Sequence, residues 1–421
     1  MGVTIANNSL LLGARKMRQD DDDDFDDVAS MASIETGRTN LSDDADFYDS
    51  YTKSDGEDAA VDEAIEELTE KRTTTRVAAL EKLSGHLSQY LPPDSITDSF
   101  VSNVLSCLRK PSEAEALHGA RILAMMALIQ GGDEERFFQR ASNVLSPLAK
   151  TSRSPAVKAA AMQSLALTCF VCSVEDENTE SLLVLFEKYF DLKIVGSICS
   201  VALQSWGLLA SSLSDEELAG DEYIDRCLPR FLELLTHVDV DVRSAAGENI
   251  ALLYEAAQKC GMTLPYDEDI IEKFRVMSKE SSKKNSKKDR KVQRMVFRDV
   301  HSTLAVSLAH FKVKKEPSES YHGESPQVSF SVKNEMLDVK SWRSIMQLEA
   351  IKNAIRTGFQ EHIKYNNVVR SILDLPDTLE ERIIDRREIF DKKSSSRKQK
   401  SNELKGDRRR KQHMQDAFLE E

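Results

Sequence analysis

The chain has 421 residues, of which 40% are hydrophobic and 30% are charged, and its formal net charge is −14 at pH 7. This length and apolar content are enough for two or three domains with buried cores. No apolar run reaches the roughly 20 residues that a membrane helix needs, and the N-terminus lacks a secretory signal, so we expect a soluble intracellular protein and exclude a membrane protein.

The negative charge lies in the first part of the chain. Residues 1–70 carry 20 Asp and Glu against 5 Lys and Arg, whereas the rest of the chain carries 51 acids and 52 bases. Dense like charge with few apolar residues opposes folding, so residues 1–60 are predicted to be a disordered acidic tail. Two roles fit this tail: keeping the protein soluble, or acting as an acidic decoy that competes with nucleic acid for basic surfaces.

Residues 61–277 are predicted to form an all-α array of HEAT or armadillo-like repeats. A basic or small polar residue is followed three and seven places later by small or apolar residues, and this triplet recurs five times, at steps of 37 to 45 residues. Such repeats have periods of about 40 to 47 residues, which allows one short copy here. They stack into a solenoid with a concave binding face, so we expect a binding scaffold. The triplets are Arg76/Ala79/Leu83, Arg121/Ala124/Leu128, Lys158/Ala161/Leu165, Cys199/Ala202/Trp206 and Arg243/Ala246/Ile250.

Loops between these helices are predicted where helix-breaking or polar residues gather. They fall at Pro92-Pro93, Gly131-Gly132, Ser154-Pro155 and the polar run Glu175–Glu180.

The sequence contains no motif that indicates an enzyme. Cys169 and Cys172 form a lone CxxC in apolar surroundings, which is typical of buried structural thiols and not of a redox or zinc site. The histidines show no metal-ligand spacing, and neither a glycine-rich phosphate loop nor GxSxG is present. We therefore expect no catalytic residues, metal, cofactor or small-molecule substrate.

A basic linker is predicted at residues 278–294. From Lys279 to Arg294 it carries eight Lys and Arg against two acids. One interpretation is a solvated connector or a nuclear localisation signal. The other is a segment that contacts nucleic-acid phosphates, because a mobile basic run gains binding free energy from the counterions that it releases. Its candidate RNA-binding residues are Lys287, Lys288, Arg290, Lys291 and Arg294.

Residues 295–385 are predicted to form a small C-terminal helical domain. Apolar residues recur at helical spacing from Trp342 to Leu375, with Trp342 in the core and His362 at its edge. Gly358 weakens a continuous helix, so a break or a close contact is expected there.

Two features before this helical stretch are less specific. The pattern from Arg294 to Ala309 fits either a helix or a strand. Lys314 and Lys333 lie in short matches to the consensus for attachment of small ubiquitin-like modifiers, a pattern that also arises by chance.

Residues 386–421 form a basic tail, with twelve Lys and Arg against four acids between Arg386 and Lys411. Free in water such a tail is expected to be disordered, but it could fold inside a phosphate-lined channel that neutralises its charge. A solvated tail or a localisation signal is the alternative. Its candidate RNA-binding residues are Arg386, Arg387, Lys392, Lys393, Arg397, Lys398, Arg408, Arg409, Arg410 and Lys411.

The chain resembles the interferon-related developmental regulator family in three stretches whose order and spacing agree with that family. They are RSAAGENIALLYE at Arg243–Glu255, DRKVQRMVFRDVHSTLA at Asp289–Ala305 and SWRSIMQLEAIKNAIRTGFQEHIKYNNVVRSILDL at Ser341–Leu375. The resemblance implies a repeat-built helical domain, a short C-terminal family domain and no enzymatic activity. It also implies a regulator, described both as a transcriptional co-regulator and as a ribosome-binding translational repressor whose C-terminal part enters the RNA path.

Two functions are therefore expected, both compatible with a cytoplasmic and nuclear protein. The first is a non-enzymatic regulator that binds ribosomal RNA and ribosomal proteins and represses translation, because its basic C-terminal segment occludes the path of mRNA or tRNA. The alternative is a nuclear scaffold that holds transcription or chromatin factors on the concave face of the repeats. The length of the basic tail exceeds what nuclear import requires, which favours the ribosome.

Overall fold

The computed structural model describes residues 55–132, 134–262, 264, 267–279, 293–305, 327–332 and 335–376. Over these ranges the chain is mainly helical, and the part that ends at Leu375 forms one compact unit. Two predicted boundaries were wrong: residues 55–60, assigned to the disordered tail, belong to a helix that begins at Asp55, and residues 278–279, assigned to the linker, end another helix. Several predicted features lie outside the described residues: the acidic tail up to residue 54, most of the basic linker, Lys314, Lys333 and the basic tail.

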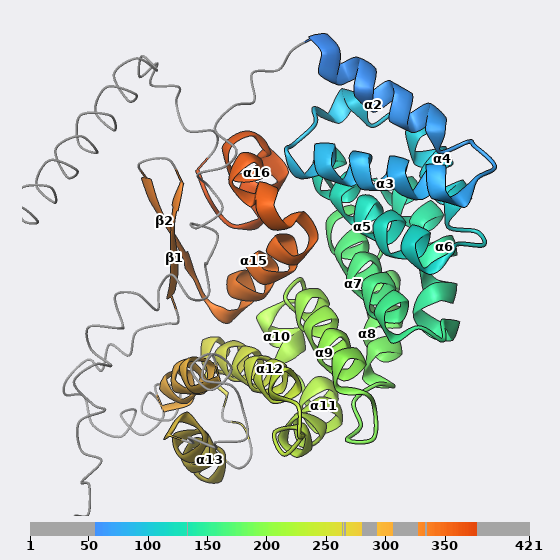
Figure 1. Cartoon of the computed structure of the whole chain (residues 1–421). Coiled ribbons are helices and arrows are strands. Elements are labelled where there is room, and N and C mark those ends of the chain that lie inside the picture. Colours follow the sequence, from blue (N-terminus) through green and yellow to red (C-terminus); the bar gives the residue numbers. More distant parts are fainter. Residues whose placement is uncertain are drawn as a thin grey trace, which may run out of the picture. The chain divides into compact units, whose positions relative to one another are not determined.

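The helices of the array alternate between two rows (Figure 1). The docking row, named for the C-terminal helices that pack on it, consists of α3 (Thr73–Ser88), α5 (Glu113–Gln130), α7 (Pro155–Cys172), α9 (Gly196–Ala210) and α12 (Val240–Lys259). The back row consists of α2 (Asp55–Glu67), α4 (Asp98–Cys107), α6 (Glu135–Thr151), α8 (Asp176–Glu187), α11 (Asp221–Leu234) and α13 (Asp267–Lys279). The short helices η1 (Pro93–Ser95) and α10 (Asp215–Leu218) lie in connections. Each docking-row helix packs on the next and on the back-row helix before it, which confirms the predicted helical-repeat architecture.

The repeat is more regular than the sequence triplets suggested. The docking-row helices begin at residues 73, 113, 155, 196 and 240, so they recur every 40 to 44 residues. Four of the predicted triplets begin at the fourth residue of such a helix, whereas Arg121 lies five residues beyond that position in α5. Helix α5 is buried on most of its sides, so Ala124 and Leu128 are buried too. The triplet pattern therefore matched at Arg121, although Arg121 lies outside the position that the other triplets share. No repeat is short.

The core runs continuously through both rows. Trp206 of α9 is fully buried, and its ring lies 5.1 Å from that of Phe231 in α11 and 6.4 Å from that of Phe190. Such aromatic packing stabilises a core beyond the area it buries.

Helix α7 is long and apolar enough to cross a membrane by length and composition, but most of it is buried by α5, α6 and α9. Its Cys169 and Cys172 are buried free thiols, as predicted. Burial raises the pKa of each thiol to about 12, which keeps both protonated at neutral pH. Within the described residues, no group of three or more His, Cys, Asp or Glu could hold a metal ion.

The structure revises one local prediction and resolves one ambiguous stretch. The polar run Glu175–Glu180 was predicted as a loop, but α8 already begins at Asp176. The prediction was wrong because acidic residues in the first turn complement the positive end of the helix dipole. The ambiguous stretch after the basic linker is helical at residues 293–305.

The C-terminal part begins with an antiparallel hairpin of β1 (Gln327–Val332) and β2 (Glu335–Lys340). Three helical pieces and a 3-10 turn follow: α15 (Trp342–Ile355), η2 (Arg356–Gly358), α16 (Phe359–Tyr365) and α17 (Asn367–Ile372). The hairpin was not predicted from the sequence. Its signal is a short alternation in which Val328, Phe330 and Val332 are buried and the residues between them are polar.

Candidate functional site

The docked segment, residues Ser341–Leu375, packs along the docking row. Helix α15 contacts α12, α9, α7 and α5, whereas α16 contacts α3 and α17 contacts α5 (Figure 1). The segment therefore follows the row backwards, from its last helix towards its first. Stacked helical repeats offer partners an extended face of this kind. Here the chain covers that face with its own C-terminal helices.

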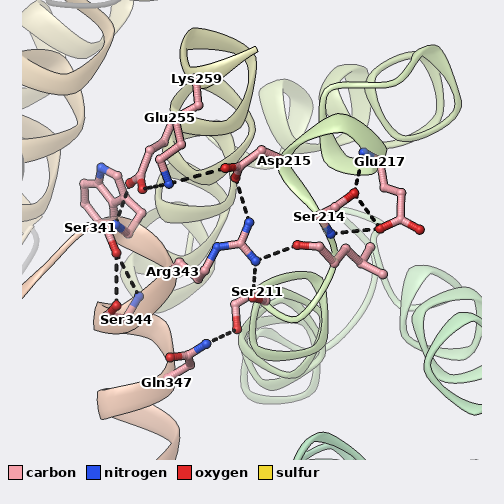
Figure 2. A network of polar contacts seen from close by, with 12 residues as sticks. Ser211, Ser214, Asp215, Glu217, Glu255, Lys259, Ser341, Arg343, Ser344 and Gln347 are labelled. Carbon is pink, nitrogen blue, oxygen red and sulfur yellow. Dashed lines mark hydrogen bonds and ion pairs between the residues drawn. The ribbon is translucent and has the colours of Figure 1, made fainter. Parts of the chain in front are cut away.

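Arg343 fixes the start of the docked segment, as Figure 2 shows. Its guanidinium donates hydrogen bonds to the carbonyl oxygens of Ser211 and, at 2.6 Å, of Leu213. It also forms an ion pair with Asp215 at 2.7 Å. The last carbonyls of a helix have no partner within it and carry partial negative charge, so a cation at the end of α9 satisfies both needs.

The first turn of α15 is held by further polar contacts (Figure 2). The backbone N–H of Trp342 donates to Glu255 of α12 at 2.6 Å, and Glu255 pairs with Lys259 at 3.0 Å. The side-chain amide of Gln347 donates to the Ser211 hydroxyl at 3.1 Å. A carboxylate near a helix N-terminus is favourable, so Glu255 positions α15 as well as pairing with a cation.

Trp342 also connects the docked segment to the helix at residues 293–305. Its indole N–H donates to the hydroxyl of Thr303 at 2.8 Å, and the side chain is fully buried. The predicted core role of Trp342 is therefore confirmed, with its one polar atom satisfied.

Arg121 holds the other end of α15. It donates to the carbonyl oxygens of Ala354 and Ile355, each at 2.8 Å, and to the hydroxyls of Ser84 and Ser88 at 3.2 and 3.1 Å. Burial lowers the pKa of its guanidinium to about 10, and the charge of Arg356 acts in the same direction. The residue still carries its charge at neutral pH. Arg121 lies five residues beyond the position at which the other triplets begin in their helices, and this placement brings its side chain to the C-terminal end of α15.

At Gly358 the backbone of the docked segment passes close to the backbone of α3. A Cβ placed on it would lie 1.5 Å from the carbonyl oxygen of Ser88 at the end of α3. No side chain fits there, which confirms both the predicted helix break and the predicted close contact. The break divides α15 from α16.

His362 and Asn366 anchor α16 and α17. The Nε2 of His362 lies 2.9 Å from the carbonyl oxygen of Leu87, and its Nδ1 lies 3.1 Å from the Asn366 amide. Asn366 also donates to the carbonyl oxygen of Leu128 at 2.8 Å. This arrangement needs a neutral imidazole that donates from Nε2 and accepts at Nδ1. Burial lowers the pKa of His362 to about 4, although its hydrogen bond to Leu87 opposes the shift. His362 is fully buried and does not lie at the core edge as predicted.

The described residues contain only one of the predicted RNA-binding residues. Arg294 lies in the first turn of the helix at residues 293–305 and is half-buried. The others lie outside the described residues, so their roles stay predictions. They are Lys287, Lys288, Arg290, Lys291, Arg386, Arg387, Lys392, Lys393, Arg397, Lys398, Arg408, Arg409, Arg410 and Lys411.

The comparisons with known proteins agree on a family. The model of the family described as "Interferon-related developmental regulator (IFRD)" matches residues 30–305. Interferon-related developmental regulator 2 of Mus musculus is 27% identical over 334 residues, covering 74% of this chain and 71% of that protein. Interferon-related developmental regulator 1 of Homo sapiens is 21% identical over 334 residues, covering 74% and 70%.

Among solved structures, a designed armadillo repeat protein in complex with the peptide (KR)4 is similar at a TM-score of 0.38 and 16% identity. That match covers 57% of this chain and 99% of the designed protein. An engineered protein matches at a TM-score of 0.37 and 18% identity, covering 57% and 97%. Both likenesses concern the fold only.

The close contact at Gly358 predicts opposite effects for two glycine-to-alanine substitutions. Gly358→Ala forces apart two backbone segments and should lower the free energy of unfolding by roughly 1–3 kcal/mol. Gly85→Ala is the matched control, because it lies within α3 with no atom within 4 Å of the added Cβ. It should raise the free energy of unfolding by about 0.5–1 kcal/mol. Urea unfolding measures both, and a stabilising Gly358→Ala would contradict the packing of the docked segment.

The burial of His362 predicts that acid weakens the docked segment. Its pKa falls from 6.5 to about 4 on folding, so the unfolded state binds the proton first as the pH drops below 6.5. The contribution of neutral His362 to the free energy of unfolding is complete above that pH. It should decrease by about 2 kcal/mol between pH 7 and pH 5.

Amide hydrogen exchange of residues 359–375 at the two pH values measures this loss. His362→Gln should show a smaller pH-dependent change than the natural chain, whereas His86→Gln, which leaves His362 in place, should keep the full change. Equal pH dependence in both variants would assign the effect to other groups.

Proposed function

The chain belongs to the interferon-related developmental regulator family, and from this premise we propose that it binds the ribosome and represses translation without catalysing a reaction. The observation that carries the proposal is where the docked segment ends. Leu375 is buried against the array, and the sequence from Asp377 onwards contains the predicted basic tail. The tail, residues 386–421, is therefore joined through the short stretch 376–385 to a residue buried in a folded body.

A fixed starting point matters for a segment that works by occlusion. A free basic peptide meets any phosphate surface, whereas a tethered one has a high effective concentration at sites within its reach. Neutralising its charges on RNA releases counterions and removes the repulsion that opposes ordering. The helical array would contact ribosomal RNA and ribosomal proteins, while the tail would enter the space that mRNA or tRNA needs.

The alternative, a nuclear scaffold for transcription or chromatin factors, relied on an open concave face. The docked segment covers this face through Arg343, Arg121 and His362 and through the contact at Gly358. A partner would have to displace these contacts or use another surface, which weighs against this form of the alternative. We propose residence in both cytoplasm and nucleus, with the ribosome as the cytoplasmic partner.

Sedimentation of cell lysates on sucrose gradients tests the proposal. The intact chain should migrate with 80S particles that carry no mRNA, because bound protein and translation exclude each other. Chains that end at Asp391 or at Pro376 should stay near the top, and the intact chain alone should repress a cell-free translation reaction.

A matched pair of tail variants separates charge from length. Replacing Arg408, Arg409, Arg410 and Lys411 by Gln should weaken comigration, whereas replacing the tail acids Glu388, Asp391, Glu403 and Asp407 by their amides should preserve or strengthen it. If the intact chain stays at the top of the gradient, or resides only in the nucleus, the ribosome proposal fails.

A further inference from the structure

Exposed cations occupy four of the five loops that lead from a back-row helix into the next docking-row helix; the fifth, between α11 and α12, has no Lys or Arg. Each of four successive loops, with its flanking residues, carries two, and all eight side chains are exposed. We call this set the basic edge: Lys71, Arg72, Arg109, Lys110, Lys150, Arg153, Lys188 and Lys193. We propose that the basic edge binds the phosphate backbone of folded RNA. The inference deepens the proposed function and rests on it only for the choice of RNA as the polyanion.

The loops of the basic edge are neighbours in space although about 40 residues separate them in sequence. Arg76 after the first loop pairs with Glu115 after the second at 2.6 Å. Ser154 of the third loop donates to Glu113 beside the second at 2.6 Å. The Tyr189 hydroxyl of the fourth loop donates to the carbonyl oxygen of Ala149, next to the third, at 3.2 Å.

The same side of the array continues to the end of the basic linker. Arg243 in the first turn of α12 donates to the side chain of Gln293 at 2.7 Å. Gln293 is the first described residue after the gap at 280–292 and is helical, so this end of the described helix lies beside the N-terminus of α12.

Two kinds of cation meet at these loops, and their contacts distinguish them. Arg76 donates to the carbonyl oxygens of Glu70 and Lys71, and Arg243 donates to those of His237 and Val238, so both close the turn before their helix. None of the eight basic-edge side chains forms an ion pair or hydrogen bond in the part of the chain that the structure describes. Their charges remain available to a ligand.

The distribution of acids strengthens the positive potential. At the opposite edge of the array, the first turns of α4, α6, α8, α10 and α11 all contain acidic residues, as helix dipoles favour. At the basic edge, the first turns of α3, α7 and α9 contain none, whereas α5 has Glu113 and Glu115 and α12 has Asp241. The exposed acids among these loops are Glu70, Asp191 and Glu113, and Glu113 accepts a hydrogen bond from Ser154.

The geometry suits a linear polyanion. Packed helices lie about 8–10 Å apart, so four successive loops span roughly 25–30 Å. A surface depression between the first two loops is lined by four cations, Lys71, Arg76, Arg109 and Lys110, and by one acid, Glu70. A nucleic-acid backbone presents regularly spaced phosphates along such a length and releases condensed counterions on binding, which an acidic peptide does to a smaller extent. These features favour RNA over an acidic protein segment.

The test compares two full-length variants in which four exposed cations become Gln. The edge variant changes one residue in each loop: Arg72→Gln, Lys110→Gln, Arg153→Gln and Lys193→Gln. The control variant changes four exposed cations elsewhere: Arg136→Gln, Arg298→Gln, Lys340→Gln and Arg356→Gln. The dissociation constant for an RNA hairpin with a long stem is measured from 50 to 300 mM salt, and unfolding curves check that both variants stay folded.

The edge variant should bind more weakly, and the slope of its plot of log affinity against log salt should flatten by up to about 3.6, because each of four lost phosphate contacts removes about 0.9. The control should match the natural chain. An edge-variant slope equal to that of the natural chain overturns the inference, even when ribosome sedimentation succeeds. If RNA binding persists but a peptide of residues 16–30 no longer binds the edge variant, the edge serves the chain's own acidic segment, and the inference is equally overturned. Failure of the proposed function would appear separately, as an intact chain that does not sediment with ribosomes.

Discussion

Two arginines placed at the carboxyl ends of helices hold the structure together as one unit. Arg343 of the docked segment satisfies carbonyl oxygens at the end of α9, and Arg121 of the array satisfies those at the end of α15. A buried carbonyl without a partner costs about as much as a lost hydrogen bond, so neither helix end could be covered without these cations. Each contact joins residues more than 100 positions apart, whereas the repeats depend mostly on contacts between neighbouring helices. The docked segment thus needs a formed array on which to pack.

This docking decides which surfaces remain for other molecules. With the docking row covered, the outer face of the back row and the loops at the two edges of the array are the surfaces left among the described residues. The two edges differ in charge, since acids gather in the first turns of the back-row helices and exposed cations gather in the loops before the docking-row helices. A regulator that works on a large polyanion needs such a separation, because mixed charges would cancel at the distance of a phosphate backbone.

Much of the fold could be predicted from the sequence because its signals are local. Helical periodicity predicted the array, and the apolar surroundings of Cys169 and Cys172 predicted that both thiols are buried. The cost of glycine within a helix predicted a break or a close contact at Gly358. The docked segment could not be predicted in place, because nothing local to Ser341–Leu375 says what covers its apolar face. Its signal was present only as an irregularity: the triplet at Arg121 broke the repeat spacing. The basic edge was missed for the same reason. The sequence analysis found cations that are contiguous along the chain, whereas these become neighbours only when the repeats stack.

The missing acids at the basic edge bear on whether that edge was shaped by stability alone. An acidic residue in the first turn of a helix stabilises it by about 0.3–1 kcal/mol, and the back-row helices make repeated use of this. Helices α3, α7 and α9 lack that stabilisation, whereas α5 and α12, which begin at the same edge, keep acids in their first turns. The two acids of α5 are held within the protein: Glu113 accepts a hydrogen bond from Ser154, and Glu115 pairs with Arg76. The exposed cations of the four loops have no such partners among the described residues. The unpaired cations, more than the absent acids, therefore support a polyanion as the ligand of this edge.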